Sequence, residues 1–511
     1  MKRNKFNLSY TKLLTCDMGE LVPIGLTEVL PGDTIQQATS ALVRCAPLLA
    51  PVMHPVRIAI HHWFVPHRLV WEDFQDFITG GPDGLDDSIF PTITLGGGSG
   101  AAIGSLADYL GVPTGVNNLE VSALPFRAYA MIWNEFYRDQ DLQTPLVIDE
   151  TSGPDTTTNT ALQNADWEKD YFTSARPWEQ KGPAITIPLG SEAPVLGFGP
   201  KTGTDNKATP SGATTIFDSN GVQRALAAHW QQFNDPSDTA TTTGEMRYGL
   251  EAQTLGGVTY PHLRADLSNA SAITINALRE AMALQRYAEA RARYGSRYTE
   301  YLRYLGVKSS DARLQRPEYL GGGREVVQFS EVLQTAEGTD GPVASMYGHG
   351  IAGMRSNRYR KFFEEHGYII SLLTCRPKTI YGQGLFRHWN RRGKEDYWQQ
   401  ELQHIGQQEI LNKEVYAAHA SPNDTFGFQD RYDEYRRSES LISGEFRDTT
   451  LDHWHMSRIF GSTPALNASF VSSVPTKRIF ASTDTDGLYI NAKHSIQARR
   501  MVAAVGRSFI Y

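Results

Sequence analysis

Alternating apolar and polar residues at 55–66, PVRIAIHHWFVP, predict a β-strand with one face on a core. Side chains on successive strand residues point to opposite faces, so a period of two is the signature of a half-buried strand. One face carries Val56, Ile58, Ile60, His62 and Phe64. Pro66 has no N–H to donate, and it therefore marks the end of the pairing. The residues that follow, RLVWEDFQDFI, are spaced for a short helix that leans on the sheet.

Further strands are predicted near both ends of the chain. TIQQATSALVRC at 34–45 is extended, and the continuous apolar run GYIISLLTCRP at 367–377 is typical of a strand buried on both faces. We also expect extended structure in ASFVSS (468–473), KRIFAS (477–482) and the final stretch 495–511.

Helices are expected between these strands. The apolar stripes of 122–140 and 275–295 have helical spacing, a shorter helix follows at 296–306, and 222–233 reads as a helical fragment. The latter lies inside 191–270, a segment rich in small and polar residues that we interpret as one long insertion. Strands at both ends with helices and long loops between them favour a mainly β fold with helical insertions, a β-sandwich whose connections have grown large.

Composition narrows the class of protein. Hydrophobic residues make up 40% of the 511 residues and aromatic residues 11%, enough for one large β domain with broad contact surfaces. The three cysteines, Cys16, Cys45 and Cys375, lie too far apart for a disulfide framework or a zinc module. We expect them to be reduced and buried. The N-terminus lacks the apolar stretch of a signal peptide, which predicts a soluble protein made without export.

The charge is negative overall but unevenly spread. The net charge is −7, while 279–316 carries nine Lys/Arg against four Asp/Glu and 471–511 carries six against two. Such asymmetry fits a body with one or two basic faces, and it also fits ordinary surface variation. The Tyr/Arg alternation at 285–306 could stack on nucleic acid, or it could be the solvated face of an amphipathic helix pair.

The candidate catalytic and metal-binding motifs each lack a residue or a spacing that the chemistry requires. GGGSG at 96–100 lacks the second glycine of a nucleophile elbow, and GFGPKTG at 197–203 lacks the spacing of a dinucleotide fingerprint. DTDG at 484–487 has its glycine too early for a calcium loop. His453 and His455 have ligand spacing but no local third ligand, and we interpret them as packed histidines.

The histidine-rich stretch at 61–67 is also better explained by architecture. His61 and His62 are neighbours on one strand and point to opposite faces, so they cannot easily share a metal ion. His62 falls in the apolar row and is interpreted as a satisfied core histidine. Whether His67 or Arg68 contacts a neighbouring subunit stays open.

Several long blocks, taken in order, resemble the major capsid protein of the Microviridae bacteriophages, in particular the gokushovirus branch. The matching blocks are 5–34, 51–81, 124–146, 309–323, 364–377, 381–416, 426–436 and 451–455. They cover nearly the whole chain, whereas 191–270 shows the least resemblance. We therefore expect a single jelly-roll domain over 1–511 with 191–270 as a variable insertion.

The resemblance implies a viral jelly roll of eight antiparallel strands and no enzymatic activity, cofactor or metal. It implies a T=1 icosahedral shell around circular single-stranded DNA, assembled in the bacterial cytoplasm, with the insertion forming threefold protrusions for host attachment. The implied partners are other copies of the chain, the genome, a small basic internal DNA-binding protein, scaffolding and pilot proteins, and a host surface receptor, possibly a glycan.

A net acidic shell cannot neutralise its genome by itself, which fits the separate basic protein. We expect some basic residues near the two termini to face inward, toward DNA or that internal protein. The candidates are Lys2, Arg3, Lys5, Arg499, Arg500 and Arg507. The alternative function is a β-rich carbohydrate-binding protein or glycoside hydrolase, which the abundant aromatic and acidic residues would support.

Overall fold

The computed structural model describes residues 3–82, 85–96, 100–183, 185, 275–294, 297–308, 310–337 and 342–504, and eight short strands between 195 and 265. The chain divides into two compact units, Met1–Lys181 with Ala288–Tyr511, and Gly182–Tyr287. Within the described part of the chain, no helix is long and apolar enough to cross a membrane.

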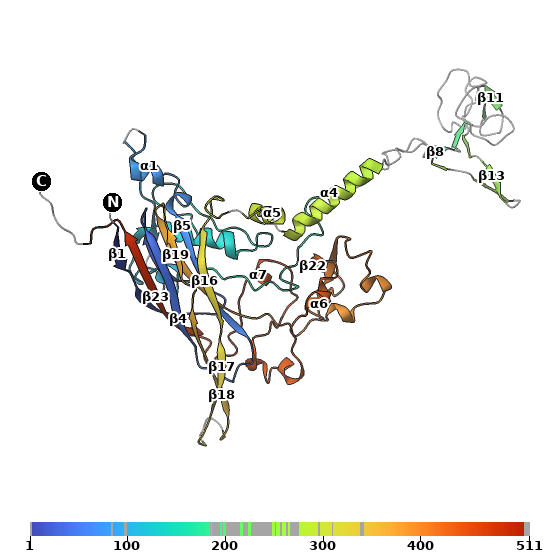
Figure 1. The fold of residues 1–511 in the computed structure, drawn as a ribbon. Coiled ribbons are helices and arrows are strands. Elements are labelled where there is room, and N and C mark those ends of the chain that lie inside the picture. The colour runs from blue at the N-terminus through green and yellow to red at the C-terminus, as the bar shows by residue number, and fades with distance from the viewer. Residues whose placement is uncertain are drawn as a thin grey trace. The chain divides into compact units, whose positions relative to one another are not determined.

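Seven strands form the first sheet of the larger unit (Figure 1). Its path runs through β1 (Asn4–Asn7), β23 (Leu488–Arg500), β4 (Thr34–Cys45), β18 (Met346–Arg355) and β17 (Gln328–Leu333). Two further strands lengthen it: β2 (Tyr10–Cys16) continues β1 along β23, and β19 (Tyr359–Phe362) continues β18 along β4. All of these pairs are antiparallel.

The second sheet has four antiparallel strands. Its order is β16 (Glu318–Val326), β5 (Val56–Pro66), β20 (Gly367–Pro377) and β3 (Leu21–Val29). With β1/β2, β16/β17 and β18/β19 each counted as one strand, chain order across the two sheets reads 1-8-3-6 and 2-7-4-5. Two Greek keys of this kind make a jelly roll, and the prediction of an eight-stranded antiparallel sandwich is confirmed.

The two sheets differ in how many faces they bury. Side chains from both sheets, such as Val43, Ile60 and Ile490, form the core between them. The other face of the second sheet is covered as well, because Trp63 and Ile370 pack in a cluster with α3 (Leu124–Ile132). The strand at 367–377 is therefore apolar throughout, as predicted. On the first sheet, the face that points away from the core is exposed, so buried and exposed residues alternate along a strand such as β23.

The long connections carry most of the helices. In the larger unit these include α1 (Phe74–Thr79), α2 (Leu106–Leu110), α5 (Tyr298–Tyr304), α6 (Asn412–Val415) and α7 (Ala468–Val471), with a π-turn at Trp133–Tyr137 after α3. Two-stranded antiparallel sheets are formed by β6 (Thr92–Leu95) with β7 (Leu119–Ser122), and by β21 (Gln407–Leu411) with β22 (Thr425–Asp430). Single 3-10 turns are His67–Leu69, Arg387–Trp389, Lys394–Asp396, Asp433–Tyr435, Gly444–Arg447 and Asp452–Trp454.

The smaller unit contains four short antiparallel pairs. They are β8 (Val195–Leu196) with β15 (Arg264–Ala265), β9 (Phe198–Pro200) with β12 (Tyr248–Leu250), β10 (Thr215–Phe217) with β11 (Gln223–Ala225), and β13 (Ala252–Leu255) with β14 (Val258–Pro261). The helix α4 (Ile275–Tyr294) follows and agrees with the predicted helix at 275–295.

Three local predictions were wrong. The segment at 468–473 is helical over α7, because the Asn467 side chain accepts a hydrogen bond from the Phe470 N–H at 3.0 Å and caps a helical turn. Residues 477–482 form no strand, since the Phe480 N–H closes a turn on the Lys477 carbonyl. The fragment at 222–233 was predicted to be helical, but Gln223–Ala225 pair with β10 as β11, and the other residues of the fragment lie outside the described residues. The final strand ends at Arg500, and 505–511 lie outside the described residues.

Candidate nucleic-acid interface

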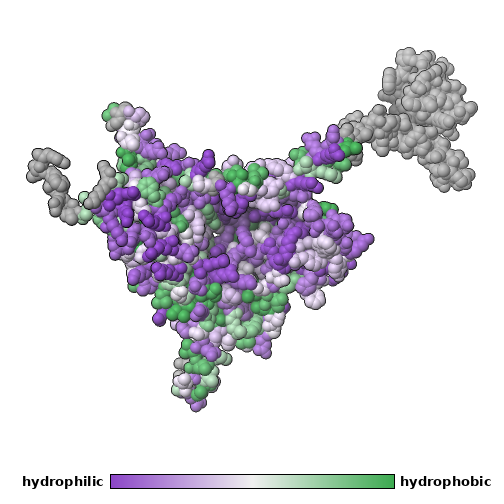
Figure 2. Space-filling view, in the orientation of Figure 1, coloured by the Kyte–Doolittle hydropathy of each residue, from purple (hydrophilic) through white to green (hydrophobic). Residues whose placement is uncertain are grey.

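The exposed face of the first sheet gathers cations from distant parts of the chain. Directly opposed residues of antiparallel strands point to the same face, so the register shows which side chains lie together. Lys5 lies opposite Arg499, and Arg499 lies opposite Thr34. Within the strands themselves, six cations occupy this face: Lys5, Arg44, Arg355, Arg360, Lys493 and Arg499. We call them the sheet-face cations; the surface over β1 and β23 is mainly hydrophilic in Figure 2.

The described part of the chain does not neutralise these cations. None of the positions that share their face on β1, β2, β4, β18, β19 and β23 is Asp or Glu. Within the described ranges, no carboxylate lies within ion-pair distance of any of the six. Unpaired cations spread over one exposed surface attract a polyanion, and phosphate contacts of this kind carry most of the affinity of sequence-independent nucleic-acid binding.

The residues predicted near the termini divide between two sides of the sheet. Arg3, Lys5 and Arg499 are exposed on the cationic side, and the Arg3 guanidinium donates to the Gly32 carbonyl at 3.0 Å. Arg500 points the other way, and its Nε lies 2.9 Å from the Asp33 carboxylate, which is fully buried. Lys2 and Arg507 lie outside the described residues.

Four members of the face were missed from sequence alone. Arg44 sits on the polar side of a strand that was correctly predicted, so alternation could have shown that its side chain points outward. Arg355, Arg360 and Lys493 come from strands whose register with β4 joins segments hundreds of residues apart. No local pattern in the sequence encodes that register.

The histidine-rich stretch lies in the core and not in a catalytic centre. His62 Nδ1 lies 2.8 Å from the Ser371 hydroxyl and its Nε2 lies 3.0 Å from the Ser356 hydroxyl, so both ring nitrogens have partners. Burial lowers the pKa of His62 to about 3, with smaller contributions from His494 and His61. His62 is therefore a neutral core residue that links strands of both sheets, in agreement with the interpretation from the sequence.

His62 belongs to a buried polar chain that crosses between the sheets. The Ser356 hydroxyl accepts from the Thr39 N–H at 2.9 Å, and the Thr39 hydroxyl lies 2.8 Å from His494 Nδ1. His494 Nε2 in turn lies 2.9 Å from the Ile24 carbonyl. Because buried polar groups are costly unless paired, this chain fixes one relative placement of the two sheets.

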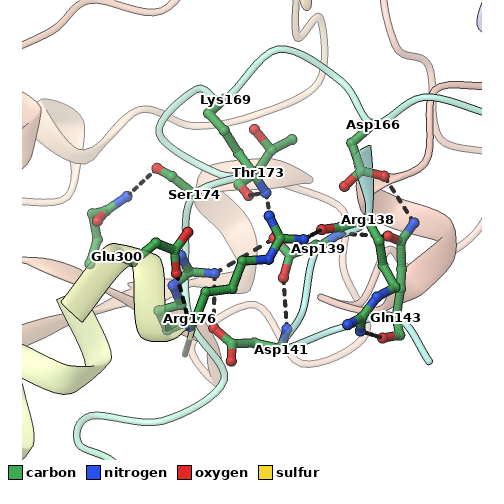
Figure 3. A network of polar contacts seen from close by, with 12 residues as sticks. Arg138, Asp139, Asp141, Gln143, Asp166, Lys169, Thr173, Ser174, Arg176 and Glu300 are labelled. Carbon is green, nitrogen blue, oxygen red and sulfur yellow. Dashed lines mark hydrogen bonds and ion pairs between the residues drawn. The ribbon is translucent and has the colours of Figure 1, made fainter. Parts of the chain in front are cut away.

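Cations in the connection after β5 differ from the sheet-face cations, because they form ion pairs within the chain. Lys169 forms an ion pair with Asp139, and Arg176 and Lys181 lie 3.2 Å and 3.0 Å from the carboxylate of Asp141. Figure 3 shows several of these side chains converging with Arg138 and Asp166. We call this set, Arg138, Asp139, Asp141, Asp166, Lys169, Arg176 and Lys181, the loop network.

The loop network also holds a carboxyl group with an unusual proton affinity. Burial raises the pKa of Asp166 to about 7, although Lys169 opposes the change. Burial would also raise the pKa of Asp139, but Lys169 beside it keeps that pKa below its ordinary value. The network therefore ties irregular segments together through internal charge pairing, and its cations are engaged within the chain.

Among the residues that the structure describes, the other candidate motifs bring no catalytic or metal-binding geometry together. No group of three or more His, Cys, Asp or Glu residues is arranged to hold a metal ion in the described part of the chain. His455 is buried with Nε2 2.8 Å from the Phe446 carbonyl, and the Asp486 carboxylate accepts from the Thr15 hydroxyl. Arg68, left open from the sequence, pairs with Glu365 of its own chain.

The basic segment at 279–316 is partly engaged within the larger unit. Arg293 lies 2.8 Å from the Asp430 carboxylate, and Arg297 donates to the carbonyls of Asn134 and Arg138. Three tyrosines of α5 remain exposed: Tyr298, Tyr301 and Tyr304. These contacts favour the interpretation of an amphipathic helix pair over that of a stacking surface for nucleic acid.

A jelly roll with large inter-strand loops is an architecture that viral capsid subunits share with lectin and cupin domains. Comparison with known proteins gives the family. Residues 1–510 match the family model described as capsid protein (F protein). The chain belongs to this phage capsid protein family, and the resemblance to the Microviridae capsid protein is confirmed.

Three relatives are similar over nearly their whole length. The chain is 39% identical to "Capsid protein VP1" of Bdellovibrio phage phiMH2K, covering 95% of this chain and 90% of the relative. It is 33% identical to "Capsid protein VP1" of Chlamydia phage 1, covering 95% and 91%, and 31% identical to that of Spiroplasma virus 4, covering 92% and 87%. The protein is therefore a structural component of a virion that assembles with copies of itself, and not an enzyme.

Proposed function

We propose that copies of this chain close into a T=1 icosahedral shell around circular single-stranded DNA, with the sheet-face cations turned toward the genome. The observation that carries the proposal is the set of six unpaired cations with no carboxylate among them on the strands of one exposed face. A second partner follows from the overall charge. Because the net charge is −7, a separate small basic protein would supply most of the internal neutralisation.

Exposed apolar residues on the β17–β18 hairpin support contacts between copies. The cross-strand pairs Val332–Tyr347 and Leu333–Met346 are adjacent, so they point to opposite faces of the ribbon. Val332 is 50% exposed and Tyr347 38%, and Leu333 is 48% exposed and Met346 47%. Figure 2 shows hydrophobic surface on this projecting hairpin. A two-stranded ribbon with apolar residues on both faces is marginal in water, and we propose that neighbouring copies cover it.

The remaining partners follow from the family. We propose that 191–270 is the variable insertion, that it forms a protrusion at the threefold axes, and that this protrusion meets a host surface receptor, possibly a glycan. Scaffolding and pilot proteins are further proposed partners during assembly in the host cytoplasm. The proposal that Lys2 and Arg507 face inward with Arg3, Lys5 and Arg499 stays a prediction, whereas the Arg500 side chain is engaged with Asp33 of its own chain.

Genome content of purified particles tests the inward-facing surface. The variant K5Q/R360Q/R499Q removes three sheet-face cations that make no ion pair with the described part of the chain. We expect particles that sediment as multi-megadalton shells but contain less DNA per subunit, or release it at lower salt, because phosphate contacts are lost. DNA per particle is measured by absorbance ratio and by quantitative PCR.

The matched control is R303Q/K308Q/R313Q, which makes the same charge change at exposed cations outside the sheet. These particles should package like the unmodified chain. Equal DNA content and salt resistance in all three preparations would contradict the inward-facing assignment. A monomer or small oligomer in sedimentation of the unmodified protein would contradict the shell itself.

A further inference from the structure

A hollow of about 580 Å³ opens at one end of the cationic face, where β2, β4 and β23 meet the segment leading into α2. It falls within the range typical of small-ligand pockets. Its lining includes Leu13, Leu42, Arg44, Ile103, Tyr489 and Asn491. No part of the proposed shell function above depends on this hollow.

The walls of the hollow are apolar although they point to solvent. Leu13, Asn491 and Leu42 form one cross-strand row, and Tyr489 lies between Thr15 and Arg44 in the next row. Leu13 is 76% exposed, Ile103 is 86% exposed, and Leu42 and Tyr489 are each 42% exposed. Apolar side chains this exposed on a face that also carries six cations indicate an absent apolar partner.

The polar groups around these walls differ in whether they can still bind a ligand. Arg44 has no carboxylate partner among the described residues, and Asn491 offers an amide that can both donate and accept. Lys12 is already engaged, since its ammonium donates to the carbonyls of Pro23 and Tyr109. The one carboxylate in the lining, Asp108, accepts from the Gly104 N–H at 2.9 Å.

We propose that this hollow takes an unpaired base of single-stranded DNA, with the base lying against Leu13 and Tyr489 and the adjoining phosphate on Arg44. This rests on the proposed function. Charge complementarity selects the occupant, because the hollow adjoins a surface of unpaired cations, and unpaired DNA presents planar apolar groups and phosphates on one strand. A side chain of another protein copy would meet the apolar walls but would leave the cations unpaired.

The test compares two oligonucleotides of equal length, oligo-dT and an abasic strand that keeps the sugar-phosphate chain but has no bases. Affinities of the full-length unassembled protein are measured over a range of salt concentrations. We expect oligo-dT to bind about tenfold more tightly than the abasic strand, a preference typical of base stacking on side chains. L13S/Y489S should abolish this preference without changing the salt dependence.

Two further variants separate the roles of the hollow. R44Q should keep the preference for bases but reduce the slope of log affinity against log salt by about one phosphate contact. Y489F keeps the ring and should behave like the unmodified chain. If L13S/Y489S unfolds, ultraviolet crosslinking in native particles gives the same answer, with a DNA adduct expected on the peptide that contains Tyr489.

Each outcome bears on a different claim. Equal affinity of the unmodified chain for both oligonucleotides, with salt-dependent binding, would overturn the base site and leave the inward cationic face standing. Loss of assembly in L13S/Y489S with an unchanged base preference would overturn it in favour of contact with another copy. Binding of neither strand would overturn the base site together with the DNA-facing role of the sheet.

Discussion

The sheet-face cations and the cations after β5 are the same residue types in opposite circumstances. Each of the five Lys/Arg residues between 124 and 181 donates to or pairs with a group of its own chain. The six sheet-face cations have no carboxylate partner in the described ranges. The number of cations alone does not distinguish these two regions, whereas pairing does.

The difference shows which cations are paired within the subunit and which are left for a partner outside it. Irregular segments have few backbone ladders, so internal ion pairs and hydrogen bonds hold them in place. A regular sheet is already held by its ladders, and its exposed face is free to carry charge that stabilises nothing within the subunit. Unpaired charge on such a face destabilises the isolated chain slightly and is expected to be satisfied only by an external anion.

The largest effect is expected at the most deeply buried pair, Arg127–Asp155. Both side chains are fully buried, with Arg127 Nε 2.8 Å from the carboxylate, and the guanidinium also donates to the carbonyls of Val70 and Thr151. R127M leaves Asp155 without its cation and should lower the free energy of unfolding by about 3 to 5 kcal/mol. Urea unfolding of the unassembled chain measures it.

The control from the other region is R44M. Arg44 is exposed and unpaired within the described part of the chain, so its replacement should change stability by less than about 0.5 kcal/mol. Similar losses for R127M and R44M would break the distinction between paired and unpaired cations, since both would then contribute to the subunit.

How far this distinction can be predicted from sequence depends on the range of the contacts. Alternation located β5 and β4 and pointed His62 inward. The partners of His62, Ser356 and Ser371, lie about three hundred residues away, and no local pattern pairs them with it. Likewise, the terminal cations could be proposed as a group, but the register that sends Arg499 to the exposed face and Arg500 to Asp33 is a tertiary property.

A second, intermediate effect concerns buried histidines, which are surrounded by the core and have no carboxylate partner among the described residues. Burial lowers the pKa of five histidines to about 4 or below: His54, His61, His62, His67 and His494. Their unfolded forms titrate near pH 6.5. Between the folded and unfolded pKa values the unfolded chain binds more protons, so stability is complete above about pH 6.5 and falls as the pH decreases.

For His62 alone, lowering the pH from 7 to 5 should cost about 2 kcal/mol. The measurement is the free energy of unfolding at pH 7.5 and pH 5.0. H62Q should show a smaller loss, because glutamine does not titrate, whereas H388Q, at an exposed histidine, should lose as much as the unmodified chain. An undiminished loss in H62Q would show that the acid sensitivity arises elsewhere, for example at the other buried histidines.

The smallest effect on the subunit is expected at the β17–β18 hairpin, where apolar side chains are exposed. Val332 and Tyr347 form a cross-strand pair in which Val332 is 50% exposed and Tyr347 38% exposed. V332S/Y347S should change the free energy of unfolding of the unassembled chain by less than about 0.5 kcal/mol, since surface substitutions remove little buried contact. Assembly should nevertheless be impaired, with less material in the fast-sedimenting fraction. Normal assembly of this variant would mean that the hairpin, unlike the sheet-face cations, has no external partner. Exposure of apolar side chains would then not be enough to identify a surface that binds neighbouring copies.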